Sequence, residues 1–189
     1  MKMPNGYNET MAAGSWQPLA SGGYVCRILN AREEMTRTNK PMVVVQLEIA
    51  EGDEAGRFGR EFAADTRDMP KWPASGVMRQ LTEDKDGRCS PFFKAMITSL
   101  EKSNEGWHPQ WDDGFCKSLQ GKFIGVVYGR EQYEKSDGTI AFSTKPQRAC
   151  SVAEVREGRI IPPEDKLLKT ASAPASSGWS EMSDSQLPF

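Results

Sequence analysis

The stretch Met42-Val43-Val44-Val45-Gln46-Leu47-Glu48-Ile49-Ala50 decides the fold class of this chain. Every odd position from 43 to 49 is apolar, and polar residues occupy the even positions 46 and 48. Successive side chains of a β-strand point to opposite faces, so a period of two indicates a strand that is buried on one side. We therefore predict a strand over 42–50 whose odd-numbered residues face the core, with Val44, Gln46 and Glu48 facing away.

A preceding strand is predicted just upstream. Residues 24–31 alternate, which places Tyr24, Cys26 and Ile28 on one face. The polar segment between the two strands contains Thr38-Asn39-Lys40-Pro41, residues that favour turns. The two strands are therefore expected to form a hairpin with a long, charged loop.

Three further strands are predicted downstream. The short run Arg60–Ala63 follows a glycine-rich, acidic segment and is predicted as the third strand. Residues 121–129 and 139–143 are predicted as the fourth and fifth strands. Ser136-Asp137-Gly138 between them is typical of a hairpin turn.

Two helices are predicted from their end signals. Ser90 stands as N-cap before Pro91 at the first helical position, and apolar residues follow at helical spacing as far as Leu100. This helix lies between the third and fourth predicted strands. A second, short helix is expected over 151–157, stopped by Gly158.

Five strands with one helix between the third and fourth are the order of an OB-fold barrel, so the predicted class is mainly β. Residues 1–21, rich in small and polar residues, are expected to be a flexible N-terminal arm. Residues 22–163 are expected to form the OB-fold domain. Residues 164–189 have too few apolar side chains for a core and are expected to be a disordered linker and tail.

Length and charge limit the functions open to the chain. Its 189 residues suit one core, and 38% hydrophobic with 26% charged residues is typical of a globular protein. The net charge is −2, and the residues before 164 contain 22 bases and 22 acids. Bulk positive charge therefore cannot hold a nucleic acid, and any such site must be a local patch assisted by stacking.

The cysteines indicate neither a metal site nor a disulfide framework. Cys26, Cys89, Cys116 and Cys150 are far apart, without a CxxC pair, and His108 is the one histidine. No metal or other cofactor is expected. No apolar run near the N-terminus is long enough for a signal peptide or a membrane span, so a cytoplasmic protein with free thiols and no membrane contact is predicted.

The last nine residues resemble the extreme C-terminus of bacterial single-stranded-DNA-binding proteins, which end in acids, an apolar residue, proline and phenylalanine. The resemblance implies that Phe189 anchors in an apolar pocket of a partner protein. The implied contact residues are Glu181, Asp184, Leu187, Pro188 and Phe189. Ser185 and Gln186 stand where that family usually has acids. The implied partners are replication and recombination proteins.

Residues 22–163 look more like phage-encoded single-stranded-DNA-binding proteins from replication and recombination gene clusters. The pieces that carry this resemblance are Gly23-Tyr24, Asn39-Lys40-Pro41 and Gly121-Lys122-Phe123. The segment from Asp65 to Ser90 is an insert relative to the standard bacterial protein. The resemblance implies sequence-independent binding of single-stranded DNA in a bacterial host cytoplasm, and it leaves the oligomeric state open.

Binding of this kind needs aromatic faces for the bases and cations for the phosphates. From Lys122 to Arg148 there are five bases against three acids, so the last predicted hairpin is the first choice for the DNA face. The predicted contacts come from this hairpin, the first hairpin loop and the region of the third strand. They are Arg37, Lys40, Arg57, Arg60, Phe62, Trp72, Tyr128, Arg130, Tyr133, Lys135, Phe142, Lys145 and Arg148.

Two other functions compete with this one. A nuclease would need acidic ligands for Mg²⁺. The available acids stand in loop sequence without a motif: Asp65, Asp68, Asp84, Asp86, Asp112 and Asp113. Since no catalytic constellation is present, the chain is not expected to be an enzyme. The stronger alternative is an OB-fold adaptor that binds replication or recombination proteins but not DNA.

Overall fold

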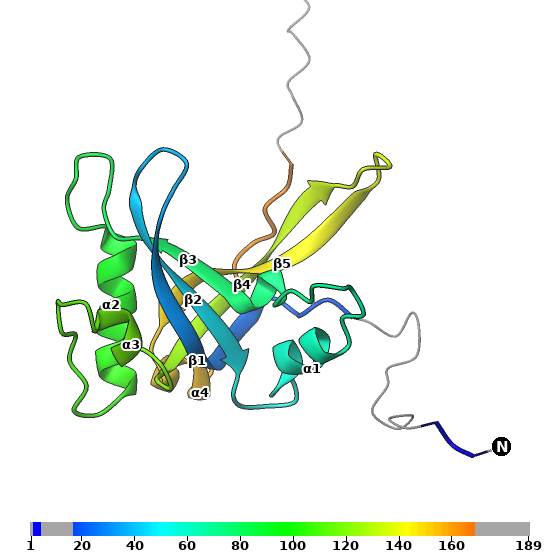
Figure 1. Cartoon of the computed structure of the whole chain (residues 1–189), viewed down its shortest axis with the longest axis horizontal. Coiled ribbons are helices and arrows are strands. Elements are labelled where there is room, and N and C mark those ends of the chain that lie inside the picture. Colours follow the sequence, from blue (N-terminus) through cyan, green and yellow to red (C-terminus); the bar gives the residue numbers. More distant parts are fainter. Residues whose placement is uncertain (1, 5–16, 169–189) are drawn as a thin grey trace, which may run out of the picture.

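The computed structural model describes residues 2–4 and 17–168, and it shows a mainly β protein (Figure 1). Its elements in chain order are β1 (Gly22–Met35), β2 (Pro41–Ile49), α1 (Arg57–Ala63), the 3-10 helix η1 (Ala74–Gly76), β3 (Val77–Leu81), α2 (Pro91–Ser103), α3 (Phe115–Ser118), β4 (Phe123–Glu134), β5 (Ile140–Cys150) and α4 (Val152–Arg156). No helix within these described ranges has the length and apolar character that crossing a bilayer requires.

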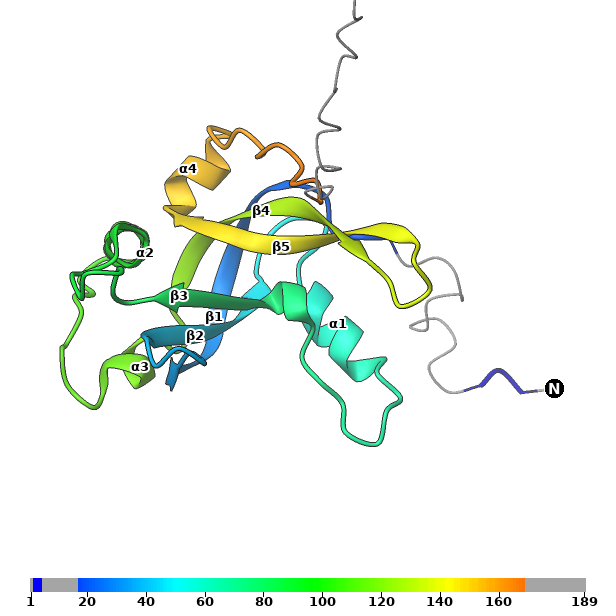
Figure 2. The same cartoon turned by 90° about the horizontal axis from the view of Figure 1, so that it is seen from above.

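The five strands form one antiparallel sheet in the order β3-β2-β1-β4-β5. The central strand β1 pairs with β2 over most of its length and with β4 over its first half. The edge strands β3 and β5 approach to within 8 Å between Cα atoms, yet no backbone ladder joins them in the described part of the chain. The sheet is therefore open at this β3–β5 seam, whose two strands are seen in Figure 2.

The strand predicted from alternation is confirmed as β2. Its odd-numbered residues from 43 to 49 are buried in the main core. Val44 faces away from the core cluster as predicted, yet it is only 1% exposed. The cross-strand register places Val44 between Arg32 and Arg79, whose long side chains can shield an apolar neighbour.

The third strand is not where the sequence predicted it. Residues 60–63 belong to α1, and β3 lies in the segment that was interpreted as an insert. The helix is supported by an ion pair across one turn, from Arg57 Nε to Glu61 Oε1 at 2.8 Å. It also places the ring of Phe58, which is fully buried, in the core.

A carboxylate from the sheet starts this helix. Glu48 accepts hydrogen bonds from the backbone N–H groups of Phe58 (3.0 Å) and Gly59 (2.6 Å). These groups belong to the first turn, whose N–H groups have no partner inside the helix, and a negative charge there is favourable. The cap comes from ten residues upstream, so no local sequence signal reveals it.

Both predicted helices are confirmed, as α2 and α4. Ser151 and Glu154 form a capping box at the start of α4: the Glu154 N–H donates to the Ser151 hydroxyl, and the Glu154 carboxylate accepts from the Ser151 N–H. The helix packs against β4 at Gly125, where a Cβ atom would lie 2.9 Å from the Val155 side chain and 2.7 Å from Cys150 Sγ. Only glycine allows this approach.

The last hairpin is confirmed but is longer than predicted, since β4 continues to Glu134 and β5 to Cys150. Its turn uses Gly138, whose φ of 79° lies in the left-handed region that favours glycine. Asp137 stabilises the turn by accepting hydrogen bonds from the backbone N–H and the hydroxyl of Thr139. The extension makes this hairpin the most prominent projection of the sheet (Figure 1).

The folded part extends beyond both predicted domain limits. Leu19, placed in the arm by sequence, is 3% exposed and belongs to the core. Its carbonyl oxygen accepts a hydrogen bond from the Thr144 hydroxyl of β5. At the other end, residues 164–168, here called the strap, run beside β4, where Lys166 and Glu131 form an isolated parallel bridge. The predicted partner-binding residues 181–189 lie outside the described residues.

All four cysteines carry free thiols. Cys26 and Cys150 are buried, and burial raises the pKa of Cys26 to about 12 and that of Cys150 to about 11. Both thiols are therefore protonated near neutral pH and act as small apolar side chains. Cys89 is exposed.

Replacing Phe58 with alanine tests the assignment of α1. Phe58→Ala should lower the free energy of unfolding by about 3–5 kcal/mol, because it empties a fully buried site. Phe62→Ala is the matched control in the same helix, since Phe62 is 39% exposed and should cost under about 1 kcal/mol. Urea unfolding followed by circular dichroism measures both. Equal costs for the two variants would contradict the placement of Phe58.

Candidate nucleic-acid interface

The β4–β5 hairpin brings a predicted cation and a predicted aromatic ring together. The guanidinium carbon of Arg130 lies 4.7 Å from the centroid of the Phe142 ring, a cation–π contact. The register pairs Arg130 with Thr144 and Gln132 with Phe142, so the contact is a diagonal between neighbouring strands. Arg130 is exposed and Phe142 is half-buried.

Tyr133 and Phe142, the two aromatic residues nearest the turn of this hairpin, point to opposite faces. Tyr133 pairs with Ala141, and the adjacent cross-strand pair is Gln132 with Phe142. Since side chains alternate along a strand, Tyr133 (41% exposed) lies on the face opposite Phe142. The sequence predicted both as stacking platforms, but one run of bases on one face of the hairpin can meet only one of them.

The strap satisfies part of the positive charge that the sequence assigned to this hairpin. Asp165 binds the Arg130 guanidinium with both carboxylate oxygens. Glu131 lies between Lys166 Nζ at 2.9 Å and Lys145 Nζ at 3.1 Å. Hydrogen bonds to these cations hold the pKa of Asp165 and of Glu131 below their ordinary values. The hairpin is therefore less positive than its sequence suggests.

A second group of candidate residues lies on the outer face of β1, β2 and β3. Cross-strand register and alternation place these side chains on the side of the sheet away from the core. The outer face consists of Asn30, Arg32, Glu34, Met42, Val44, Gln46, Val77, Arg79 and Leu81. Arg32 and Arg79 are exposed on either side of Val44. Arg32 pairs with Glu34, whereas Arg79 has no hydrogen-bonded partner among residues 2–4 and 17–168.

Sequence reasoning missed Arg79. Only a weak signal was available: Val77, Met78 and Leu81 are apolar and the segment lies between Gly76 and the turn residues Asp84–Gly87, but apolar and polar residues do not alternate in it. The segment was interpreted as an insert because the third strand had been placed at 60–63. Arg79 takes its position on the outer face only once β3 is recognised.

The first hairpin loop lies beside the loop that follows β3. Lys40 Nζ is 3.5 Å from the carbonyl oxygen of Asp84, which joins the two loops. Asn39 has a φ of 57°, in the left-handed region that asparagine tolerates well. Arg37, predicted as a contact, is exposed at the tip of this loop.

A further aromatic pair stands next to the start of β3. The rings of Phe62, on α1, and Trp72 lie 5.6 Å apart between centroids, tilted by 42°. The Trp72 indole N–H donates to the Leu47 carbonyl oxygen at 3.2 Å, which fixes this side chain against β2. Phe62 is 39% exposed, so the pair offers an accessible ring on a fixed support.

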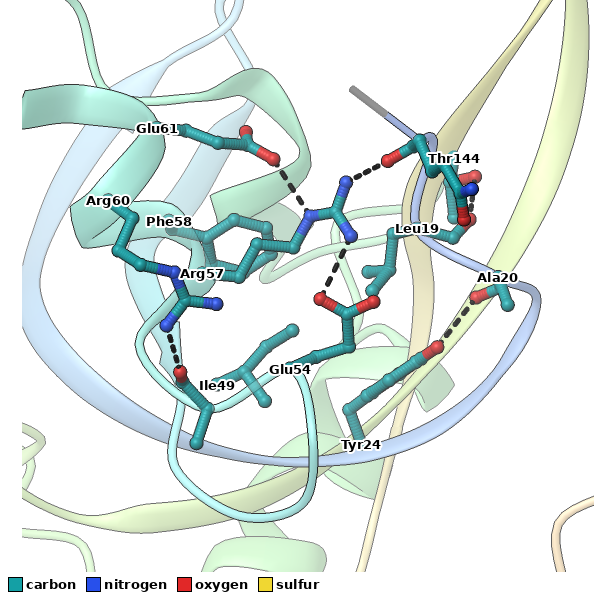
Figure 3. A network of polar contacts seen from close by, with 12 residues as sticks. Leu19, Ala20, Tyr24, Ile49, Glu54, Arg57, Phe58, Arg60, Glu61 and Thr144 are labelled. Carbon is teal, nitrogen blue, oxygen red and sulfur yellow. Dashed lines mark hydrogen bonds and ion pairs between the residues drawn. The ribbon is translucent and has the colours of Figure 1, made fainter. Parts of the chain in front are cut away.

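Two predicted contacts are corrected, because both are buried in structural roles. Tyr128 is fully buried in the core and packs edge-on against Tyr24, with centroids 5.5 Å apart. Burial raises the pKa of Tyr128 well above its ordinary value. Arg57 lies between Glu54 and Glu61 and donates to the Gln17 carbonyl oxygen (Figure 3). Neither side chain is free to contact a nucleic acid.

The remaining predicted residues are exposed but dispersed. Arg60, on α1, donates to the Ala55 carbonyl oxygen. Lys135 is at the turn of the β4–β5 hairpin, and Lys145 pairs with Glu131. Arg148, near the end of β5, lines a separate groove against α2. The structure therefore divides the predicted site among the first hairpin loop, the α1 region, the last hairpin and this groove.

Three of the acids considered for a nuclease, Asp65, Asp84 and Asp112, accept hydrogen bonds from the backbone of their own turns or loops. Asp65 binds Arg67 and accepts from the Lys71 N–H, and Asp84 accepts from the backbone of residues 86 and 88. Asp112 accepts from the Gly114 N–H at 2.8 Å. Within residues 2–4 and 17–168 no three His, Cys, Asp or Glu side chains are grouped so as to hold a metal ion.

Comparisons with known proteins do not identify a relative. No protein-family model matches the chain, and no curated protein matches it in sequence. The resemblance to single-stranded-DNA-binding proteins therefore stays a prediction.

Arg57→Ala tests the structural role of Arg57. The change leaves two partly buried carboxylates without their cation, so the free energy of unfolding should fall by about 2–4 kcal/mol. Arg60→Ala, one turn further on and exposed, should cost under about 1 kcal/mol. Urea unfolding and oligonucleotide binding are measured together. If the Arg57 variant has unchanged stability but binds the oligonucleotide more weakly, the structural assignment is wrong and Arg57 contacts the nucleic acid.

Acid should release the strap. The pKa values of Asp165 and Glu131 are lowered in the folded protein, so their ion pairs stabilise the strap fully at a pH above the ordinary carboxyl pKa values. This stabilisation is lost as the pH falls below about 4 and the two carboxylates are protonated. Hydrogen exchange of the Lys166 amide, which donates to the Arg130 carbonyl oxygen, should accelerate beyond its intrinsic pH dependence. Asp165→Asn should weaken the same protection at neutral pH. Unchanged Lys166 protection at pH 3, with the β2 amides still protected, would contradict this assignment.

Proposed function

We propose that this chain is an OB-fold protein that binds single-stranded DNA without sequence preference, in bacterial or phage replication, recombination or repair. The order of elements supports the fold: five antiparallel strands, with α2 between the third and the fourth. The approach of β3 to β5 supports it as well, because these two strands close the barrel in that fold.

The observation that carries the proposal is the Arg32–Val44–Arg79 row on the outer face. It places two exposed guanidinium groups, one of them paired with Glu34, on either side of a buried apolar residue, on the face around strands 2 and 3 that OB-folds use for oligonucleotides. Figure 1 shows the β1–β2 and β4–β5 hairpins projecting on the same side of the molecule, with β3 between them. Such loops border the strand-binding surface in this fold class.

Aromatic residues supply the contact with bases. The Phe62–Trp72 pair lies next to the start of β3, and the Arg130–Phe142 pair lies on the last hairpin. Stacking is indifferent to base identity, since every base has an aromatic face. With a balanced body charge, stacking would provide much of the affinity and the outer-face arginines would place the phosphates.

The C-terminal residues are part of the proposal through their resemblance alone. Phe189 and Pro188 would bind an apolar pocket on a replication or recombination protein, with Leu187, Asp184 and Glu181 as supporting contacts. The competing function is an OB-fold adaptor that keeps this tip but has no DNA site.

Fluorescence anisotropy with labelled oligo-dT, at low and moderate salt, tests the proposal against a duplex of the same length. Tight, salt-weakened binding of the single strand alone is expected. Arg79→Glu should weaken binding and reduce the salt slope by about 0.7, the value for one lost phosphate contact. Phe62→Ala should cost about 1–3 kcal/mol of binding, or roughly 5–150-fold.

Arg159→Glu is the matched charge control, since Arg159 is exposed near α4 and pairs with Glu157. It should leave affinity within about twofold of the unaltered protein, a change of ~0.4 kcal/mol. Failure of the unaltered protein to bind either oligonucleotide would overturn the proposal in favour of the adaptor. Equal weakening by Arg79→Glu and Arg159→Glu would refute the outer face as the site.

A further inference from the structure

A basic groove lies between α2 and the end of β5, away from the outer face. Its volume is about 420 Å³. The basic groove is lined by Pro91, Lys94, Ala95, Thr98, Ser99, Lys102, Arg148, Ala149, Cys150 and Glu154. Figure 2 shows α2 beside the end of β5 that leads into α4. Apart from Arg148, none of these residues is among the DNA contacts predicted from the sequence.

The groove has an excess of positive charge. Lys94, Lys102 and Arg148 are exposed, and none forms an ion pair within residues 2–4 and 17–168. The single acid, Glu154, is engaged by the N–H of Ser151 at 2.8 Å and by its hydroxyl at 2.7 Å. Three cations therefore face a single carboxylate that already has partners, which favours an anionic ligand.

The spacing of these cations suits a chain of anions. Lys94, Thr98 and Lys102 follow each other at intervals of four residues, so they lie on one face of α2. The two lysines are about 12 Å apart along the helix axis, since each residue rises ~1.5 Å. Arg148 contributes from β5 on the other side of the groove. A line of cations fits a linear polyanion better than one compact anion.

The rest of the lining indicates which part of a nucleic acid would lie here. It consists of aliphatic and small polar side chains and contains no aromatic ring. Bases would find no stacking platform, whereas phosphates would find cations and the Thr98 hydroxyl. Recognition in this groove would therefore depend on the backbone and not on base identity.

The groove also shares strand β5 with the β4–β5 hairpin, whose Arg130–Phe142 pair is part of the proposed DNA site. Lys145, in the β4–β5 hairpin, and Arg148 are three residues apart on β5, roughly 10 Å along the strand. We propose that the basic groove binds the phosphodiester backbone of single-stranded DNA that extends beyond the outer face, which lengthens the binding site. This inference rests on the function proposed above.

Two lengths of oligo-dT, about 6 and about 16 nucleotides, test it, because OB-fold sites range from ~4 to ~16 nucleotides. Lys94→Glu combined with Lys102→Glu should weaken binding of the longer oligonucleotide at least about fivefold, a change of ~1 kcal/mol. Its salt slope should fall by about 1.4, for two lost contacts. The shorter oligonucleotide should bind as before. Lys94→Arg with Lys102→Arg should retain full affinity for both.

Lys117→Glu combined with Arg159→Glu is the matched control, since both residues are exposed and lie outside the groove and the outer face. It should leave the affinity for both lengths unchanged, and thermal melting checks that every variant is folded. Unchanged binding of the longer oligonucleotide by the Lys94/Lys102 variant would overturn the inference while the proposed function stands. Equal weakening at both lengths would overturn it too. If the unaltered protein binds neither length, the proposed function fails first.

Discussion

The contact between Glu48 and the start of α1 is the interaction on which the rest of the fold depends. The carboxylate on β2 binds the first-turn N–H groups of α1, which directs Phe58 into the core. The same helix positions Arg57, which donates a hydrogen bond to the Gln17 carbonyl oxygen. Two residues further along the chain, Leu19 is buried in the core. Leu19 in turn binds Thr144 of β5. One cap thus begins a chain of contacts from β2 to β5 around the side of the sheet that has no ladder.

This dependence explains which parts of the fold were predictable. The strand at 41–49 and the helices α2 and α4 follow from periodicity and end signals contained within each segment. α1 does not, because its stabilising carboxylate comes from a neighbouring strand. The short run 60–63 has no strong period of its own, so tertiary contacts decided its conformation. Misplacing it concealed β3 among residues taken for an insert.

The candidate site was predictable in composition more than in geometry. The sequence indicated a hairpin with aromatic residues and cations, and Arg130 and Phe142 do meet there. It could not separate Tyr133 from Phe142, because the face of each residue depends on the register of the two strands. It also counted Arg57 and Tyr128 as available. Tyr128 packs against residues far away in sequence, such as Tyr24, whereas the carboxylates that hold Arg57 are only three and four residues away. The net charge of the hairpin also could not reveal that Asp165 of the strap forms an ion pair with Arg130.

The open seam between β3 and β5 has a mechanical consequence. In the described part of the chain, every other neighbouring pair of strands is joined by a ladder of backbone hydrogen bonds, whereas β5 approaches β3 and the preceding η1 without such a ladder. Side-chain packing tolerates a small change of separation more easily than a hydrogen-bonded ladder does. The sheet can therefore widen or narrow along this seam at the lowest cost in free energy. Such a movement would change the distance between the projecting β1–β2 and β4–β5 hairpins.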